Sequence, residues 1–536
     1  MSPAAQASPQ PRGWLPAPVA LALLIVILIA FIGESIPLLI VDLRQQMGLT
    51  SEQAGLIRFA PAAAGLLLAP STGGLADALG ARKVLMTALS MIALGALLIA
   101  TSSGLPLFTC GLLVSGVGEL STTIVAYSLV TKAAKDAKQL AIYSSIWAIT
   151  WQASYLVCPP IIAAILSDTD RSWPAIGATI LTASMTLIVV AGKLTKNPTA
   201  RDAAVSSALP QRRNKPSTWE WKILLGIIFS LTTSIPILDV VKPSLTPILL
   251  SLDIGLTALL AAVIKGSREI QKQLSFFAKP ILVLATLALA ATYLVDWNYY
   301  TERFITLRYS LNLHQASAWV TPFNIASLLG ATCFGGVSLR LGVLKSTLGC
   351  TLIWLATPFI FILTTTSAPI ALSAAAIGFF TLVGSFAFTG IQSFAASQVP
   401  NDNRAMWASI MVGINTIVKS AGGALTSDVM MNTYQEALRN KLSPLPLSGD
   451  LIEKIIQWLT EGKFHLVLEN DYNIPAFIIN TYLTRTAPER LTAYTSCLHA
   501  LGYLCLGMVM VVSALLIASA LLQRRLLTST ANIANR

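Results

Sequence analysis

Apolar residues in this chain occur in long, nearly unbroken runs. About 20 consecutive apolar residues are enough to span a bilayer as a helix. The runs do not alternate apolar and polar positions as a membrane barrel would, so we predict an all-α polytopic membrane protein. Fourteen spanning helices are expected, at 15–41, 53–73, 83–103, 105–131, 139–166, 173–194, 222–241, 244–264, 279–301, 317–337, 343–365, 368–397, 405–430 and 491–523.

The composition agrees with a chain that lies mostly in lipid. Of 536 residues, 54% are hydrophobic and 11% are charged, whereas soluble domains carry about 25% charged residues. The net charge of +12 is spread over alternate loops and forms no basic face, so a nucleic-acid partner is not expected. The six cysteines have no CxxC or Cys/His spacing, so we expect neither a metal site nor a cofactor nor a disulfide framework.

The basic loops predict the orientation of the chain. The segment 193–222 carries seven basic residues against two acidic ones, and the positive-inside rule places it in the cytoplasm. Both termini are then cytoplasmic, and the expected location is a bacterial inner membrane.

Loop composition also predicts the domain organisation. Pro-rich and polar residues follow the first six spans, and two further spans precede the last six. The expected parts are an N-terminal six-helix bundle (1–194), a cytoplasmic linker (195–221), an inserted two-helix hairpin (222–278) and a C-terminal six-helix bundle (279–536).

A long loop, 432–490, is expected on the outer side. Its stretch "LIEKIIQWLTEG" gathers apolar residues on one helical face. Such a helix either rests on the membrane surface or acts as a gate or docking element. The sequence leaves open whether a periplasmic partner binds there.

Two short charged turns resemble each other. "GGLADALGARKVL" begins at Gly73 and joins the second and third spans, and "GGVSLRLGVLKST" joins the tenth and eleventh. Both have glycine at positions one, two and eight and lysine at position eleven. A shared turn at corresponding places predicts two related halves.

The first turn resembles the loop signature of the major facilitator superfamily. The matching positions are Gly73, Leu75, Asp77, Gly80, Arg82 and Lys83. The stretches "PLLIVDLRQQMGLTSEQAGL" and "NTIVKSAGGAL" are further similar to the fourteen-span drug:proton antiporter branch. This resemblance implies a two-bundle transporter fold that works by alternating access.

The resemblance also implies roles for the turns and the helix breakers. Asp77 is expected beside residues 402–408 when the protein opens outward, with Arg340 in the matching second turn. A solvated charged loop is the alternative. Hinges are expected at four helix-breaking residues, which are Pro159, Pro160, Gly422 and Gly423.

Ionisable residues inside spans need a reason, because each costs about 2.5–3.5 kcal/mol at the bilayer centre. Glu119 lies midway along the fourth span and Glu34 in the outer half of the first. A buried carboxyl group favours its protonated form, so both are candidate proton-coupling groups. Glu34 has a structural alternative, an ion pair with Arg58. Asp253 and Lys419 receive no role.

Aromatic residues suggest a wall of the substrate cavity. Trp147, Trp151 and Tyr155 recur every four residues on one face of the fifth span, and flat rings attract amphipathic or cationic ligands. Ordinary helix packing is the alternative. Arg58 and Thr122 complete the candidate cavity.

The leading hypothesis is a monomeric secondary transporter that exports amphipathic organic molecules, including drugs, in exchange for protons. The alternative is a dedicated transporter of one metabolite or siderophore. The antiporters' fourth-span arginine and first-span aspartate are absent here, which leaves the coupling ion and the direction open. A receptor or enzyme on the same fold is a third class, but no GxSxG or phosphate-loop motif supports an enzyme.

Overall fold

The computed structural model describes residues 15–47, 79–167, 172–194, 279–294, 313–363, 370–400, 403–443 and 487–534, and isolated positions within 57–76 and 449–456. The predicted linker (195–221) and inserted hairpin (222–278) lie outside the described residues, and so do Arg58, Asp77 and Asp253.

The regular elements in the described part of the chain are helical. Eight of these helices are long and apolar enough to cross a membrane, so the chain is a multi-pass membrane protein. The count of fourteen stays a prediction. The longer described elements are α1 (Ala17–Met47), α3 (Ala81–Ala100), α4 (Leu105–Ala133), α5 (Ala137–Ser167), α6 (Ser172–Leu194), α11 (Pro280–Ala291), α13 (Leu313–Leu341), α14 (Val343–Ala356), α15 (Pro358–Ile362), α16 (Ile370–Ser397), α17 (Arg404–Leu442) and α20 (Ala487–Ala534).

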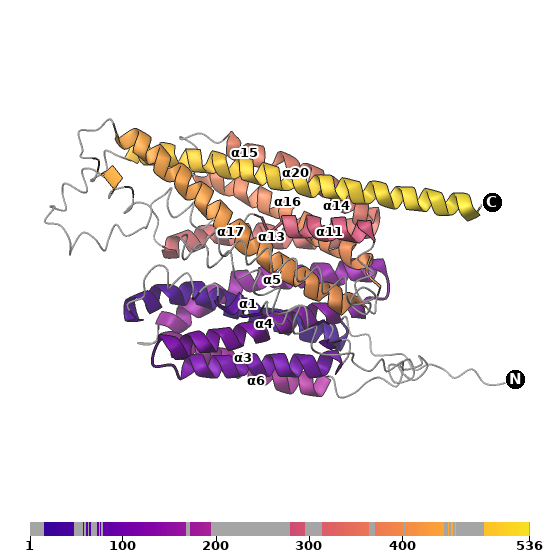
Figure 1. Cartoon of the computed structure of the whole chain (residues 1–536), viewed down its shortest axis with the longest axis horizontal. Helices are drawn as coiled ribbons and strands as arrows, with labels where there is room; N and C mark the ends of the chain where they lie inside the picture. Colours follow the sequence, from indigo (N-terminus) through magenta and orange to yellow (C-terminus); the bar gives the residue numbers. More distant parts are fainter. Residues whose placement is uncertain are drawn as a thin grey trace, which may run out of the picture.

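The helices form two bundles that lie one on the other (Figure 1). In the first bundle α3 packs on α4 and α6, and α1 packs on α4, α5 and α6. In the second, α16 packs on α11, α13 and α14, while α20 packs on α11, α14, α15 and α17. Apolar side chains fill both interiors, and many of them are completely buried. The buried apolar side chains of the two bundles form one continuous cluster.

Five of the described helices meet at the junction between the bundles. α5 of the first bundle packs on α13 and α16 of the second, and α17 crosses from the second bundle to α4. Figure 1 shows α17 running obliquely from one end of the second bundle towards the first bundle at the other end. Any site between the bundles is thus lined by α4, α5, α13, α16 and α17.

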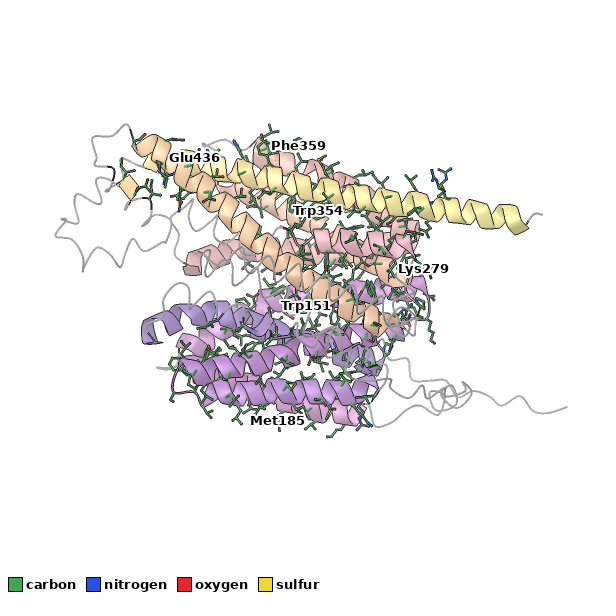
Figure 2. All side chains as sticks on the ribbon, viewed as in Figure 1. Trp151, Met185, Lys279, Trp354, Phe359 and Glu436 are labelled. Atoms are coloured by element: carbon green, nitrogen blue, oxygen red, sulfur yellow. The ribbon has the colours of Figure 1, made fainter. Side chains whose placement is uncertain are left out.

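Large apolar side chains also cover the outer surfaces of both bundles. Met185 on α6 and Phe359 on α15 are 53% and 48% exposed, and they lie on opposite sides of the molecule in Figure 2. Exposed apolar surface of this extent would be unfavourable in water. It suits contact with lipid chains.

Two helices differ in extent from the expected spans. The span expected at 343–365 is found at Val343–Ile362, but its helix is interrupted between α14 and α15, because Pro358 has no N–H to continue the helical hydrogen bonds. The span expected at 405–430 continues as α17 to Leu442. At about 1.5 Å per residue this helix is roughly 58 Å long, so it is longer than the bilayer core is thick.

The far end of α17 is joined to the outer loop. Arg439 donates two hydrogen bonds to Glu453, at 2.6 and 2.9 Å, and this guanidinium holds the pKa of Glu453 below its usual value. Ile452 and Ile456 are 7% and 2% exposed and belong to the same apolar cluster as Leu438. The apolar face expected in this loop therefore packs on protein at these two positions.

The two similar turns have the same backbone geometry. Gly80, just before α3, has φ 90°, and Gly342, just before α14, has φ 82°. Both glycines stand at position eight of their turns, and an L side chain rarely adopts a positive φ. The shared glycine of the repeated pattern thus has one structural cause in both bundles.

Candidate functional site between the two bundles

The two bundles contact each other where α4 ends and α17 begins. We call this the basic end, because Lys132, Lys135, Lys279 and Lys345 lie there. At this end the guanidinium of Arg404, on α17, donates to the backbone carbonyls of Thr131 and Ala134, the latter at 3.5 Å. These carbonyls close α4, where the helix dipole favours a cation. Arg404 is only 9% exposed.

A second contact fastens α17 to the predicted gating loop. The backbone N–H of Gly73 donates to Ser409 Oγ at 3.0 Å. A Cβ atom at Gly73 would lie 2.3 Å from the carbonyl oxygen of Ala405, so only glycine permits this approach. The loop thus meets the first turns of α17, near the residues expected beside Asp77. The position of Asp77 itself stays a prediction.

The other gating-loop candidates are spread over the surface of the basic end. Arg82 donates to the carbonyl oxygen of Gly192 on α6 at 3.5 Å. Lys83 is exposed, and Arg340 is exposed in the last turn of α13. Arg404, a residue without an assigned role in the sequence, is a cation that joins the two bundles.

Aromatic rings form a continuous ladder along the junction. Ring centroids are 6.0 Å apart for Trp407 and Tyr127, 5.4 Å for Tyr127 and Trp147, 6.3 Å for Trp147 and Trp151, and 5.7 Å for Trp151 and Tyr155. Trp407 belongs to α17 of the second bundle, and the other rings belong to α4 and α5 of the first. The predicted aromatic stripe is thus part of a longer series that crosses the junction.

The ladder is more buried towards the basic end. Trp407, Tyr127 and Trp147 are 0%, 1% and 3% exposed, whereas Trp151 and Tyr155 are half-buried. Figure 2 labels Trp151 between the two bundles. The three buried rings therefore close the junction near Arg404. The half-buried rings of Trp151 and Tyr155 lie in a less tightly packed part of it.

Polar atoms without partners surround Tyr127 at the closed end. Ser144 of α5 and Gln392 of α16 lie beside the Tyr127 hydroxyl. Among the described residues, none of the three side-chain oxygens has a hydrogen-bond partner that meets normal geometry. The hydroxyls of Tyr127 and Ser144 can donate and the amide oxygen of Gln392 can accept, so small rotations allow the three groups to pair with one another. The Arg404 contacts stabilise closure of the junction at the same end.

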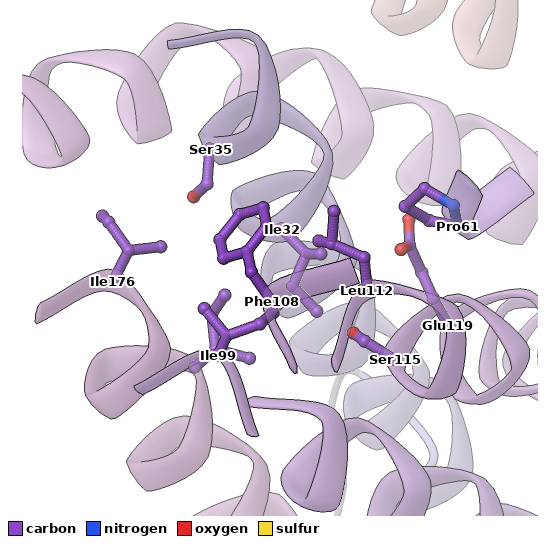
Figure 3. Close-up of a pocket in the computed structure, with 10 residues that line it drawn as sticks. Ile32, Ser35, Pro61, Ile99, Phe108, Leu112, Ser115, Glu119 and Ile176 are labelled. Atoms are coloured by element: carbon purple, nitrogen blue, oxygen red, sulfur yellow. The ribbon is translucent and has the colours of Figure 1, made fainter. Parts of the chain in front are cut away.

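Glu119 lies elsewhere, inside the first bundle. It lines a small pocket between α1, α3, α4 and α6, together with Ser35, Ser115 and mainly apolar side chains (Figure 3). The cavity volume is ≈ 10 Å³, close to the minimum of about 10–15 Å³ that one water molecule needs. In the described part of the chain the Glu119 carboxylate has no ion-pair partner. The sequence analysis expected Glu119 to face a cavity, and the cavity found at this residue is within one bundle.

The remaining cavity candidates are only partly described. Glu34 is half-buried on α1, close enough to Cys158 of α5 to interact electrostatically with it. Its predicted pairing with Arg58 is untested. Thr122 is completely buried on α4, and its hydroxyl has no partner among the described residues.

The hinge candidates lie within helices. Pro159 and Pro160 are inside α5, which is helical from Ala137 to Ser167, and Gly422 and Gly423 are inside α17. Their role as hinges stays a prediction.

Comparison with known proteins gives the family and the fold. The family model described as Major Facilitator Superfamily matches residues 23–427, which is about three quarters of the chain. No curated protein sequence matches. Three solved structures have similar folds at 12–13% identity, which is too low to indicate a shared substrate.

The first of these is the human organic anion transporter MFSD10 (TM-score 0.55, 13% identity), with 78% of this chain and 94% of that one covered. The second is a bacterial homologue of the iron transporter ferroportin in an outward-facing state (0.54, 12%), with 94% and 99% covered. The third is the proton:xylose symporter XylE bound to 6-bromo-6-deoxy-D-glucose (0.52, 12%), with 90% and 94% covered.

The family match, the spanning helices and the two joined bundles agree with one another. The chain belongs to the Major Facilitator Superfamily and has the fold of its transporters.

Proposed function

We propose that this protein is a secondary active transporter that exports a small amphipathic organic molecule in exchange for protons, by alternating access. The observation that carries the proposal is the closed basic end, where Arg404 of one bundle holds the last carbonyls of α4 in the other. A contact of this kind can break and re-form as a unit when two rigid bundles rock.

We propose that the conformation described here is an outward-facing or occluded state. By the positive-inside rule the basic end is cytoplasmic. Contacts between the bundles at that end then block access from the cytoplasm. The half-buried rings of Trp151 and Tyr155 indicate looser packing towards the outer side.

We propose that Glu119 is the residue that takes up and releases the proton. Its pocket is mainly apolar, and an ionised carboxylate is unfavourable in such surroundings. Taking up and releasing a proton there would change how α1, α3 and α4 pack. Because these helices include the one that Arg404 caps, protonation can bias the closure of the basic end.

A dedicated transporter of one metabolite or siderophore is the second candidate function. The buried polar side chains of Tyr127, Ser144 and Gln392 favour it, because fixed polar groups discriminate strongly between ligands that do and do not satisfy them. A binding site for many drugs would need fewer such groups.

Reconstituted vesicles test the proposed function. With an imposed pH gradient, we expect some member of a panel of amphipathic compounds and metabolites to move against its own gradient, with counterflow of protons. Collapse of the gradient by a protonophore should stop this uphill movement. If no compound moves and no protons follow, although the protein is folded and oriented, the proposal fails.

A further inference from the structure

The pocket at Glu119 follows one face of α4. Phe108, Leu112, Ser115 and Glu119 line it from this helix, and steps of four, three and four residues place them on a single face. Phe108 is in the first turn of α4, and Glu119 follows roughly 16 Å further along the helix axis. The pocket therefore extends from one end of the first bundle to the middle of the span.

That end of the bundle is the outer end, where α3 ends and α4 begins. Ile99 lines the pocket from the last turn of α3, and Ile176 lines it from the second turn of α6. The ring N–H of Trp173, also on α6, donates to the carbonyl oxygen of Ser102 at 3.2 Å. This bond ties the start of α6 to the loop between α3 and α4, beside the outer end of the pocket.

An apolar ring separates the polar side chains of the pocket. These are Ser35 of α1 and Ser115 and Glu119 of α4, and the other residues that line the pocket are apolar. Figure 3 shows the ring of Phe108 between Ser35 and the pair formed by Ser115 and Glu119. Phe108 is only 1% exposed. The ring therefore divides the pocket into an outer part and a part that holds the carboxyl group.

Both parts can bind water. Ser35 donates its hydroxyl hydrogen to the carbonyl oxygen of Phe31 at 2.6 Å, so its oxygen can still accept a hydrogen bond. Ser115 and Glu119 are one turn apart on the other side of the ring. The cavity of ≈ 10 Å³ is close to the size of one water molecule, which needs such polar partners. Water and hydroxyl groups can pass protons on, whereas the ring interrupts the chain.

Other titratable groups do not line this pocket. Those whose side chains the structure describes on α1, α3, α4 and α6 are Glu34, Arg82, Lys83, Cys110, Tyr127, Lys132 and Lys193. The four cations among them lie at the basic end. Glu34 interacts electrostatically with Cys158 of α5. Among the described residues, Glu119 is therefore the titratable group that protons in this pocket would reach.

We infer that protons reach Glu119 from the outer side through the interior of the first bundle, and that the ring of Phe108 is the gate on this path. Ser35 and Ser115 hold water on the two sides of the gate. The inference rests on the proposed function, which has Glu119 exchange a proton. It separates the path of the proton from the space between the two bundles.

Infrared spectroscopy of the full chain in nanodiscs tests the inference. The protonated carboxyl group of Glu119 has its own C=O absorption, which is assigned by its loss in Glu119→Gln. Transfer to heavy water shifts this band, and the rate of the shift measures proton exchange at Glu119.

Two variants should change this rate in opposite directions. Phe108→Leu leaves room for water beside the side chain, so exchange should become at least about tenfold faster, whereas Ser115→Ala removes a polar partner and should slow exchange at least about threefold.

The matched control is Phe380→Leu, because Phe380 is an equally buried ring on α16 of the second bundle. This variant should exchange at the parent rate. Backbone amide exchange of α3 and α4, measured by mass spectrometry, should be the same in Phe108→Leu and the parent, which excludes a general loosening of the bundle. Should Phe108→Leu loosen the bundle, Phe108→Met keeps more of the volume and takes its place.

The results separate the inference from the proposed function. An assigned Glu119 band whose exchange rate is the same in the parent, the Phe108 variant and Ser115→Ala would overturn the inference, while Glu119 could still carry the transported proton. Equal acceleration by Phe380→Leu would overturn it too. If no band is lost in Glu119→Gln at any pH, Glu119 takes up no proton, and its role in the proposed function fails as well.

Discussion

Replacing Arg404 by alanine should open the basic end of the molecule. The substitution removes charge-assisted hydrogen bonds to the carbonyls of Thr131 and Ala134, which are worth about 1.5–3 kcal/mol each. A loss of about 2 kcal/mol shifts the ratio of closed to open molecules about thirtyfold.

Spin labels at Lys135 and Lys345 report this change, since both side chains are exposed at the basic end and belong to different bundles. In a background without the six native cysteines, pulsed electron resonance should give a longer mean distance for Arg404→Ala than for the parent. The control Arg439→Ala removes the same side chain from the other end of α17. It should leave the distance unchanged, and an unchanged distance in Arg404→Ala would remove the assigned role of Arg404.

Replacing Glu119 by glutamine should uncouple the conformation from pH. The side chain keeps its size and a polar end but can no longer exchange a proton. When two conformations differ by one bound proton, their ratio changes by up to about tenfold per pH unit. We therefore expect the distance between labels at Lys135 and Lys345 to depend on pH in the parent and to be constant in Glu119→Gln.

The control for this experiment is Glu436→Gln, because Glu436 is exposed near the far end of α17. This variant should retain the pH dependence of the parent. If Glu119→Gln also retains it, the proton is carried by another group. Glu34 is then the next candidate, and Glu34→Gln in the same labelled background identifies or excludes it.

The fold could be predicted largely from the sequence because it follows from local properties. Long apolar runs require spanning helices, and the glycines at position eight of both turns require a positive φ at Gly80 and Gly342. Helix ends were less predictable. α17 continues to Leu442, and its last turns pack on protein through Tyr434 and Leu438. Hydropathy along the sequence does not reveal this packing.

The site could be predicted only in part, because it depends on contacts between distant segments. The aromatic stripe of Trp147, Trp151 and Tyr155 was visible from its spacing, whereas its continuation through Tyr127 to Trp407 depends on the packing of α4 and α17. Two signals were available in the sequence. Gln392 is an amide within a long apolar run, and Arg404 is a lone cation at the start of a spanning helix.

The half-buried position of Glu119 within one bundle had no sequence signal. Residues on several faces of α4 are buried, so the period of the helix does not distinguish the face towards α3 and α6 from the face towards the other bundle. Only the packing of α1, α3 and α6 around the pocket makes that distinction.

One measurement tests most directly the claim that the two bundles rock as rigid bodies. Labels at Ser103 and Leu363, both exposed at the end opposite to the basic end, give a second distance beside that between Lys135 and Lys345. As pH is varied, alternating access predicts that one distance lengthens while the other shortens, with the same midpoint. Two distances that lengthen together, or that both stay constant in the active protein, would contradict the account.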